Sequence, residues 1–436
     1  DADETVTPTY RWDINGSIVV GAMIDLSNYN VDPGTSISCI ASVSDSNGAS
    51  VEATVSNILD NRDPTVDSIS ISPTSPLSDS LLTCASSYSD LDGDNMLDLV
   101  VSDDGSNEVS VHINSGTGSF GKAFVKKLIS SGKKISRLVI FSRDELKQFE
   151  MSNMEAFKKK TDKIRFFLGD VRDYDRLKRA LDNIDVVIHA AALKQVPAAE
   201  YNPMEFIKTN INGAQNVIEA CIEHKIKRVV ALSTDKAASP INLYGATKLA
   251  SDKLFCASNP LNGSDGTRFS VVRYGNVMGS RGSVIPFFLS LKDKGVLPIT
   301  DVEMTRFMIS LEDGVKLVWH AFDDMLGGEI YVKKIPSMKV VDIAHTIAPD
   351  ARLNIIGIRP GEKLHEQLIS IDESRYTYEF RDYYKILSPL NNWNSSKKRM
   401  GKGIQVPDGF SYASDTNDSW LSGEKLNSWL TRLDKC

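Results

Sequence analysis

The sequence lacks the features by which several classes of protein are recognised. Its 436 residues contain no run of about 18 consecutive apolar residues, so we expect no membrane-spanning helix. The five cysteines include no Cys-x-x-Cys pair and the six histidines no His-Glu-x-x-His spacing, so neither a disulfide framework nor a zinc site is predicted. A hydrophobic content of 41% and a charged content of 25% are typical of a globular chain, here long enough for two to three domains.

Positive charge is scarce in the first quarter of the chain. Residues 1–110 contain 19 acidic side chains and two basic ones, Arg11 and Arg62, which makes their net charge −17. Because the whole chain has a net charge of −7, the rest has a net charge of +10. Such a division indicates two regions with different environments or histories.

Residues 1–80 are predicted to form short antiparallel strands. They are rich in Ser, Thr, Asn, Asp, Val and Ile and contain alternating runs such as TSISCIASVS. The stretch SCIASVSDSNG at 38–48 matches TCASSYSDLDG at 83–93, so Cys39 and Cys84 occupy equivalent positions and are poor candidates to bond each other. The pattern resembles the immunoglobulin-like repeats of large surface proteins and indicates an all-β segment.

Residues 81–107 make a separate acidic segment. Positions 1, 3, 5 and 9 of a loop are Asp90, Asp92, Asp94 and Asp98, a spacing of carboxylates that suits calcium. Position 12 is Val101, where an EF-hand has a glutamate. The acidic loop is followed by the strand-like run DLVV and then by GTGSF, an order that resembles an FG-GAP-type propeller repeat. A single repeat of this type cannot build a propeller. We therefore weigh a calcium site against an acidic turn between strands.

From about residue 135 the pattern changes to that of an α/β fold. Apolar strands alternate with helical stretches, and these strands are RLVIFS (137–142), IRFFLG (164–169), DVVIHAAA (185–192), RVVALS (228–233) and FSVVRYG (269–275). Strands that are almost entirely apolar are typical of a parallel sheet covered on both faces by helices. We assign residues 108–436 to a Rossmann-type, doubly wound α/β domain.

A glycine-rich turn lies at the start of this domain. The strand-like VSVHI (109–113) precedes SGTGSFG, which contains Gly116, Gly118 and Gly121, and a helical stretch follows. Glycines let the backbone approach a phosphate, and the first N–H groups of a helix bind anions. Strand, turn and helix therefore predict a dinucleotide site, against the alternative of an ordinary glycine-rich turn.

The end of the second strand indicates which dinucleotide binds. In NAD sites an acidic residue at this point holds the ribose hydroxyls, but here Ser142 and Arg143 come first. A guanidinium suits the 2′-phosphate of NADP, so we favour NADP over NAD. The alternative is that Arg143 is a solvated surface charge.

A second motif, YGATK, places Tyr244 and Lys248 on one face of a helix. It follows ALSTDKA (231–237) at the end of an apolar strand. We expect the ammonium of Lys248 to stabilise the Tyr244 phenolate and so to move its pKa from about 10 towards that of a base at neutral pH. Downstream of a glycine turn, this combination predicts a catalytic pair.

These motifs occur together with others that resemble the extended short-chain dehydrogenase/reductase superfamily. More narrowly, the chain from about residue 116 to 436 is similar to the inverting UDP-N-acetylglucosamine 4,6-dehydratases of bacterial surface-polysaccharide and flagellin-glycan pathways. The stretches that carry the resemblance are GTGSFGKAF, SRDELKQ, GDVRD, HAAALKQVPAAEYNP, TNINGAQNV, LSTDKAASPINLYGATKLASDKLF, SVVRYGNVMGSRGSVIPFF, MTRFMIS, GGEIYVKKIPSMK and IGIRPGEKLHEQ.

The resemblance implies an NADP-dependent hydro-lyase that acts on carbons 4 to 6 of UDP-N-acetylglucosamine with inversion at carbon 5. It implies a homo-oligomer formed through the α/β domain. It further implies that Tyr244 accepts the carbon 4 hydroxyl proton, that Lys236 abstracts and redelivers the carbon 5 proton, and that Asp235 assists the loss of water. A UDP-sugar 4-epimerase is the enzymatic alternative and needs only the Tyr244–Lys248 pair, so the extra groups of Thr234, Asp235 and Lys236 favour the dehydratase.

By family position, the remaining site residues divide between cofactor and substrate. The cofactor set is Gly116, Thr117, Gly118, Ser119, Phe120, Gly121, Ser142, Arg143, Asp170, Val171, Ala190, Ala191, Lys194, Asn210, Ser233, Tyr244, Lys248, Tyr274, Asn276 and Val277. The substrate set, in a smaller lobe placed mainly in 276–436, is Lys194, Asn276, Arg281, Gly282, Ser283, Val284, Arg306, Arg359 and Glu362. Packing or solvation is the alternative role for each supporting residue.

The chain departs from the family pattern at the glycine turn. The family has glycine where this chain has Ser115, and a side chain there costs strain if φ is positive. The strand VSVHI also alternates, so Ser110 and His112 would enter a core. With the abrupt change of pattern, these features lead to the hypothesis of a fused or mis-joined chain whose junction lies at GTGSFG.

The two regions also point to different locations. NADP and UDP-sugars are cytoplasmic, which places the α/β domain in the cytoplasm, whereas acidic calcium-type repeats are typical of extracellular proteins. We expect no nucleic-acid partner. The alternative from another functional class is a calcium-dependent adhesion protein in which the Rossmann part is inert.

Overall fold

In a computed structural model of the chain, the described residues are 9–14, 16–20, 36–44, 50–58, 65–72, 83–89, 109–131, 133–158, 162–261, 266–280, 282–390 and 397–433. The chain forms two compact units, Asp1–Met96 and Leu97–Cys436. Several predicted site residues lie outside the described residues, namely Asp90, Asp92, Asp94, Asp98 and Arg281. The calcium site and the three-part division of the chain therefore stay predictions.

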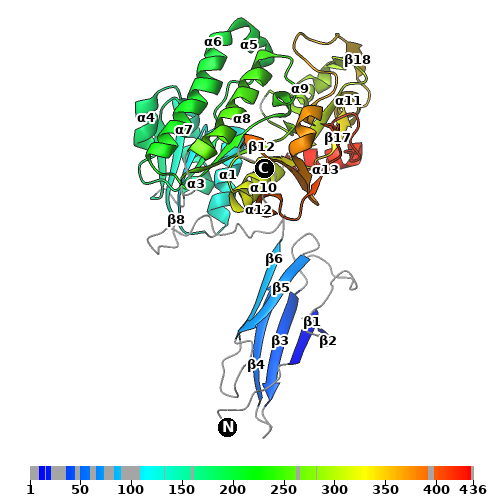
Figure 1. Cartoon of the computed structure of the whole chain (residues 1–436). Helices are drawn as coiled ribbons and strands as arrows, with labels where there is room; N and C mark the ends of the chain where they lie inside the picture. The colour runs from blue at the N-terminus through cyan, green and yellow to red at the C-terminus, as the bar shows by residue number, and fades with distance from the viewer. Residues whose placement is uncertain are drawn as a thin grey trace. The chain divides into compact units, whose positions relative to one another are not determined.

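The N-terminal unit is built from antiparallel strands, as predicted. A four-stranded sheet has the order β2-β1-β3-β4, and β5 pairs with β6 (Figure 1). Alternate residues of β1 and β3, among them Trp12, Cys39 and Ala41, are buried, which accounts for the period of two in the sequence. The strands are β1 (Thr9–Ile14), β2 (Ser17–Val20), β3 (Ser36–Ser44), β4 (Ser50–Ile58), β5 (Thr65–Ser72) and β6 (Thr83–Ser89).

A ten-stranded sheet forms the centre of the second unit. Seven parallel strands follow the order β9-β8-β7-β10-β11-β12-β16, and β21, β20 and β22 continue the sheet in antiparallel fashion. The chain winds outwards on both sides of β7, which is the predicted doubly wound topology. The strands are β7 (Val109–Asn114), β8 (Ile135–Ser142), β9 (Ile164–Leu168), β10 (Val186–His189), β11 (Arg228–Leu232), β12 (Arg268–Arg273), β16 (Ile330–Lys333), β20 (Thr377–Glu379), β21 (Tyr383–Ile386) and β22 (Ile404–Gln405).

Helices between the parallel strands pack against this sheet (Figure 1). Helices α4, α7 and α8 pack in sequence, and α1 packs on α3 and α10. Consecutive residues of β10 are all buried, so both faces of the sheet are covered there. The helices are α1 (Ser119–Ser130), α2 (Glu145–Asn153), α3 (Glu155–Lys158), α4 (Tyr174–Ala180), α5 (Val196–Tyr201), α6 (Pro203–Phe206), α7 (Gly213–Glu223), α8 (Leu243–Leu261), α10 (Leu311–Asp324) and α12 (Lys397–Met400). Within the described parts of the chain, no helix combines the length and the apolar character needed to cross a bilayer.

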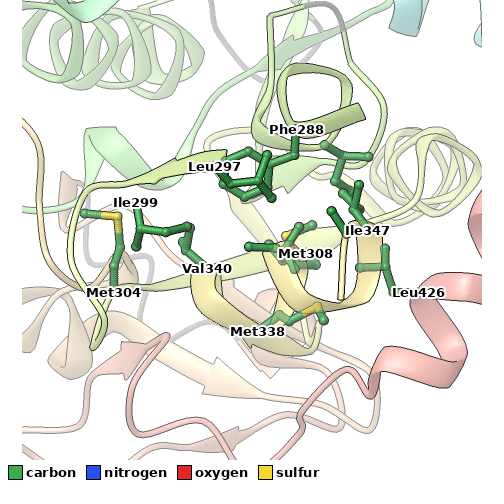
Figure 2. Packing of buried hydrophobic residues seen from close by; sticks show 13 residues of the cluster. Phe288, Leu297, Ile299, Met304, Met308, Met338, Val340, Ile347 and Leu426 are labelled. Atoms are coloured by element: carbon green, nitrogen blue, oxygen red, sulfur yellow. The ribbon is translucent and has the colours of Figure 1, made fainter. Parts of the chain in front are cut away.

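A smaller lobe is built from segments that follow β12. Figure 2 shows its core, where apolar side chains from α9, β14, β15, α11 and α13 pack together, among them Phe288, Leu297, Met308, Ile347 and Leu426. Between these segments the chain returns to the main sheet at β16, so the lobe is tied to the sheet at several points. Its elements are β13 (Asn276–Val277), α9 (Val284–Leu291), β14 (Val296–Ile299), β15 (Thr305–Ile309), β17 (Ser337–Lys339), α11 (Val340–Ile347), β18 (Arg352–Ile355), β19 (Gln367–Ile369), β23 (Tyr412–Ala413) and α13 (Gly423–Leu433).

The central strand β7 buries polar side chains, as its alternating sequence predicted. His112 Nε2 lies 2.7 Å from Asn114 Oδ1, and Asn114 Nδ2 lies 3.3 Å from His189 Nδ1 on β10. The Ser110 hydroxyl lies 2.7 Å from that of Ser136. Burial lowers the pKa of His112 to about 4, so the ring is neutral at neutral pH. These hydrogen bonds offset the cost of burying polar groups, and VSVHI therefore forms the central strand.

Candidate active site

A cleft of about 750 Å³ lies at the carboxyl ends of the parallel strands. Its walls come from the turn after β7, from the segments that follow β10, β11 and β12, and from the smaller lobe. In doubly wound sheets, ligands bind at this edge, where the winding direction reverses. The cleft therefore has the location and the size expected of a ligand site.

The glycines after β7 leave room for a phosphate at the start of α1. A Cβ atom on Gly121 would lie 2.3 Å from the carbonyl oxygen of Gly116, so turn and helix can meet only without that side chain. A Cβ atom on Gly118 would have no contact closer than 3.4 Å, so packing does not explain this glycine, which lines the cleft. The first turn of α1 contains no acidic residue. An anion at this position would accept hydrogen bonds from the first N–H groups of α1, which have no acceptor inside the helix.

Ser115 occupies the turn position that was predicted to need glycine, and its φ is +60°. Its N–H group donates to the Phe141 carbonyl at 2.8 Å, and its own carbonyl accepts from the Gly118 N–H group at 3.0 Å. These bonds hold the backbone in the left-handed region, which costs a residue with a Cβ atom about 1–2 kcal/mol. The positive φ that makes a side chain costly at this position is therefore present. That this strain weakens the binding of NADP stays a prediction.

Two arginines meet one carboxylate at the carboxyl ends of β8 and β9. Arg143 lies 3.6 Å from Asp170 Oδ2, and Arg172 donates to the same oxygen at 2.8 Å. Burial is the largest influence on Asp170 and opposes its ionisation, but the two arginines outweigh it and hold its pKa below the usual range. The side chain of Arg143 is 53% exposed, so a ligand phosphate can reach it.

The side chains beside Arg143 have other partners. Asp144, the first carboxylate after β8, caps α2 by accepting from the Lys147 N–H group at 3.0 Å. Ser142 turns inwards, and its hydroxyl lies 2.9 Å from the hydroxyl of Thr117 in the glycine turn. Ser142 therefore supports the turn and is not part of the cleft lining.

Tyr244 and Lys248 lie on α8, and both line the cleft, as predicted. The prediction that Lys248 moves the Tyr244 pKa towards neutrality is wrong, because burial is the largest influence and raises the pKa of Tyr244 to about 12. The groups that oppose this rise are Lys236 and the hydrogen-bonded Thr234. Lys248 Nζ donates to the carbonyl of Leu232 at 2.8 Å, and burial lowers the pKa of its ammonium.

Asp235 and Lys236 form a charged cluster with Glu366. Lys236 Nζ lies 3.1 Å from Asp235 Oδ1 and 2.9 Å from Glu366 Oε1. Both carboxylates are buried, and each has a second oxygen without a hydrogen-bond partner among the described residues. Buried charges are costly unless they are paired, and clusters of this kind are typical of functional sites.

The three groups of this cluster change one another's pKa values. Burial is the largest influence on each and favours the neutral form. At Lys236 the two carboxylates outweigh burial and raise the pKa, and at Glu366 the cations Lys236 and Arg306 outweigh it and lower the pKa. At Asp235 burial and the charge of Glu366 prevail, and they raise the pKa. The cluster therefore brings a proton donor and a proton acceptor into contact.

Buried polar residues support the site from behind. The Ser233 hydroxyl donates to Asp252 at 2.8 Å, and Asp252 pairs with Arg273 at 3.3 Å. The side chain of Asn210 accepts from the Leu193 N–H group at 2.8 Å and donates to the carbonyl of the same residue at 2.9 Å. Asn210 thus positions the segment after β10 and does not line the cleft.

The smaller lobe contributes two arginines to the lining of the cleft. Arg306 donates to the carbonyls of Leu364 and Lys363 at 3.0 Å, and it lies 3.4 Å from Glu362 Oε1. Arg359 pairs with Glu362 at 3.0 Å, and its side chain is 62% exposed. Two guanidinium groups on one wall suit a ligand with a diphosphate.

Most residues predicted from the sequence meet in this one cleft. The predicted residues that line it are Gly118, Ser119, Phe120, Gly121, Ala190, Lys194, Ser233, Thr234, Lys236, Tyr244, Lys248, Tyr274, Asn276, Val277, Gly282, Ser283, Val284, Arg306, Arg359 and Glu362. Those that are not part of its lining are Gly116, Thr117, Ser142, Arg143, Asp170, Val171, Ala191, Asn210 and Asp235. Sequence reasoning missed Gln195 and Glu366, although both occur within stretches that carry the family resemblance.

Comparison with known proteins identifies the family. A family model described as polysaccharide biosynthesis protein matches residues 111–388, which is more than half of the chain. The chain therefore belongs to this family. The match lies within the second unit, and the resemblance of residues 1–115 to surface repeats gains no support from it and stays a prediction.

Several relatives match the chain over most of their own length. The UDP-N-acetylglucosamine 4,6-dehydratase (inverting) of Campylobacter jejuni subsp. jejuni serotype O:2 is 56% identical over 327 residues, which cover 73% of this chain and 96% of that protein. A UDP-glucose 4-epimerase of Rickettsia conorii is 44% identical over 329 residues, with coverages of 74% and 95%. The X-ray structure of Pen from Bacillus thuringiensis has a TM-score of 0.66 at 38% identity and covers 74% of this chain and 98% of its own.

Proposed function

We propose that the chain is an NADP-dependent inverting dehydratase that converts UDP-N-acetylglucosamine to a UDP-4-keto-6-deoxy-hexosamine for surface polysaccharide or flagellin glycan synthesis. The observation that carries this proposal is the contact of Lys236 with Asp235 at 3.1 Å, in the cleft that Tyr244 also lines. It is supported by 56% identity to an inverting dehydratase of that substrate. We place the reaction in the cytoplasm, where nucleotide sugars are made.

The residues of the cleft fit a dinucleotide. Gly118 has no side chain, so a pyrophosphate can approach the backbone at the start of α1. Packing against neighbouring atoms does not require a glycine at this position. Arg143 is exposed at the end of β8, whereas Asp144 is used as a helix cap. Arg143 also pairs with Asp170 at 3.6 Å, but it is exposed enough for its guanidinium to meet the 2′-phosphate, so we propose NADP. When bound, the cofactor supplies the hydride acceptor for carbon 4 and returns the hydride at carbon 6.

Tyr244 is the proposed base for the carbon 4 hydroxyl. As the C4–H bond breaks, the oxygen on carbon 4 must lose its proton, and the phenol oxygen of Tyr244 is the group in the cleft that takes it. Burial opposes the phenolate, while the charge of Lys236 and the hydrogen bond with Thr234 stabilise it. Thr234 and Lys236 therefore contribute to the first step as well as to the later ones.

Asp235 and Lys236 are the proposed acid and base of the elimination. The ketone on carbon 4 acidifies the proton on carbon 5. Transfer of a proton from the Lys236 ammonium to the Asp235 carboxylate, over their 3.1 Å contact, leaves a neutral amine and a carboxylic acid. The amine then takes the carbon 5 proton, and the acid protonates the carbon 6 hydroxyl, which leaves as water. The raised pKa of Asp235, which burial causes, favours the acid form that this step needs.

A UDP-sugar 4-epimerase is the second candidate, because relatives 44% identical to the chain have that name. An epimerase needs Tyr244 and rotation of the sugar, and it has no use for the Asp235–Lys236 pair. Lys236, which lines the cleft, and Asp235, which contacts it from behind, form a paired acid and base that favours the dehydratase.

Mass spectrometry of the product distinguishes the two reactions. We expect the chain, incubated with NADP⁺ and UDP-N-acetylglucosamine, to form a product lighter than the substrate by one water, and to incorporate deuterium at carbon 5 in D₂O. The Lys236→Ala variant should form none of it. An isomer of unchanged mass would favour the epimerase, and binding of neither NADP nor substrate would contradict both candidates.

A further inference from the structure

Glu366 brings a third ionisable group to the proposed elimination site. It lies 130 positions after Lys236 in the sequence and directly before β19, yet its Oε1 atom is 2.9 Å from Lys236 Nζ. Its backbone is fixed by two hydrogen bonds to Ser414, one from the Glu366 N–H group at 2.9 Å and one to the Glu366 carbonyl at 2.8 Å. The carboxylate therefore approaches Lys236 from an element other than the one that carries Asp235.

The surroundings of Glu366 keep its carboxylate charged and directed into the cleft. The side chain is 2% exposed and lines the cleft, and its Oε2 atom has no hydrogen-bond partner among the described residues. Arg306 Nε lies 3.9 Å from Oε1. The titratable groups that act on this cluster from the packed elements are Asp235, Tyr244, Lys194, Arg306 and Lys363.

Glu366 and Asp235 are not equivalent neighbours of Lys236. Asp235 holds a proton during the proposed elimination and so loses its charge at the moment when Lys236 acts as a base. Glu366 faces two cations, Lys236 and Arg306, and remains ionised. An amine beside a fixed carboxylate is a stronger base, because the carboxylate stabilises the ammonium that forms when the amine takes a proton.

We propose that Glu366 is a positioning residue for the carbon 5 step, which holds the Lys236 amine in place and strengthens it as a base. The inference rests on the dehydratase function proposed above. A residue that merely linked the smaller lobe to the sheet would change stability, but it would alter neither the basicity of Lys236 nor the balance between the chemical steps.

The first test measures Lys236 directly in the cofactor-free chain. Acetic anhydride acetylates neutral amines, so the rate of Lys236 acetylation at pH 9, relative to exposed Lys126, reports the neutral fraction by peptide mass spectrometry. Loss of an adjacent opposite charge lowers a lysine pKa by about 1 to 3 pH units, so Glu366→Gln should raise the relative rate about 10- to 1000-fold. Glu366→Asp, which keeps the charge, should raise it far less. The matched control is Glu362→Gln, which removes a cleft carboxylate that pairs with Arg306 and Arg359, and it should leave the Lys236 rate unchanged.

The second test separates the chemical steps. In Glu366→Gln, cofactor reduction followed by absorbance in a single turnover should persist, while the loss of water slows by about tenfold or more and KM changes little. Glu362→Gln should instead raise KM. The proposal is overturned if Glu366→Gln leaves Lys236 acetylation unchanged, if Glu366→Asp raises it as much, or if both chemical steps slow equally. Failure of the unaltered chain to release water would contradict the dehydratase function, whereas the acetylation test would still report on the Glu366–Lys236 pair.

Discussion

Replacing Ser115 by glycine should stabilise the second unit. Ser115 has a φ of +60°, and a left-handed conformation costs a residue with a Cβ atom about 1–2 kcal/mol. Glycine removes this strain, but it loses about 0.5–1 kcal/mol through the greater freedom of the unfolded chain. The difference between the midpoints predicts a gain of about 0.7 kcal/mol in the free energy of unfolding and a rise of about 2 °C in Tm.

Urea unfolding of the whole chain tests this prediction. Trp319 stacks on Phe124 of α1 with ring centroids 4.6 Å apart, so its fluorescence reports on the helix that follows the turn. The matched control is Ser115→Ala, which keeps the Cβ atom and its strain and removes only the hydroxyl. We expect this control to unfold within about 0.5 kcal/mol of the parent chain.

The same variants test whether the turn weakens cofactor binding. If the turn with NADP bound favours glycine, relief of about 1 kcal/mol corresponds to about fivefold tighter binding by Ser115→Gly in isothermal titration calorimetry. Ser115→Ala should not gain affinity. Unchanged stability together with equal, tight NADP binding by the parent chain and by Ser115→Gly would refute the claim that this turn is strained and damaged.

Three further predictions concern the elimination, cofactor choice and acid stability. Lys236→Ala should lower kcat for water loss by about 10²- to 10⁴-fold, with mass spectrometry of the product as the measurement. Arg143→Ala should weaken NADP binding by about 10- to 100-fold and leave NAD binding nearly unchanged, whereas equal losses for both cofactors would contradict the assignment. Burial lowers the pKa of His112 from 6.5 to about 4 in the folded chain. Between pH 6.5 and pH 4 the unfolded chain therefore binds a proton that the folded chain does not. The free energy of unfolding consequently falls as the pH falls from 6.5 to 4. The loss is about 3 kcal/mol at pH 4, and urea titrations of His112→Val should show a pH dependence smaller by this amount.

The sheet could be predicted well because its signals are local. The stretch RVVALS at 228–233 has an apolar centre, VVAL, and it becomes β11, which lies between β10 and β12 with its three central residues buried. The turn after β7 is recognisable from its glycines, and the sequence alone marks Ser115 as its weak position, where φ is +60°. Neighbouring residues carry the information in both cases, since a parallel strand buried on two faces is typically apolar at most positions.

The charges of the site could not be predicted in this way. The motif YGATK suggested that Lys248 lowers the Tyr244 pKa, but a motif does not report how deeply a phenol is buried, and burial decides the pKa. Ser142 was placed correctly at the end of β8, yet its hydroxyl bonds to Thr117 and not to the cleft. Side-chain direction and burial depend on contacts between elements, which spacing along the chain does not encode.

Local sequence was therefore enough for the alternation of the main strands with helices, the glycine turn before α1 and the placement of Tyr244 and Lys248 on one helix. Only the tertiary structure brought Glu366 against Lys236 and placed Arg306 beside Glu366. It also showed how β7 buries His112, through hydrogen bonds to Asn114 on the same strand and to the Ala180 carbonyl of α4. The physical reason is that electrostatic interactions and hydrogen bonds act through space, so groups far apart in the sequence determine the chemistry once the chain brings them within a few ångströms.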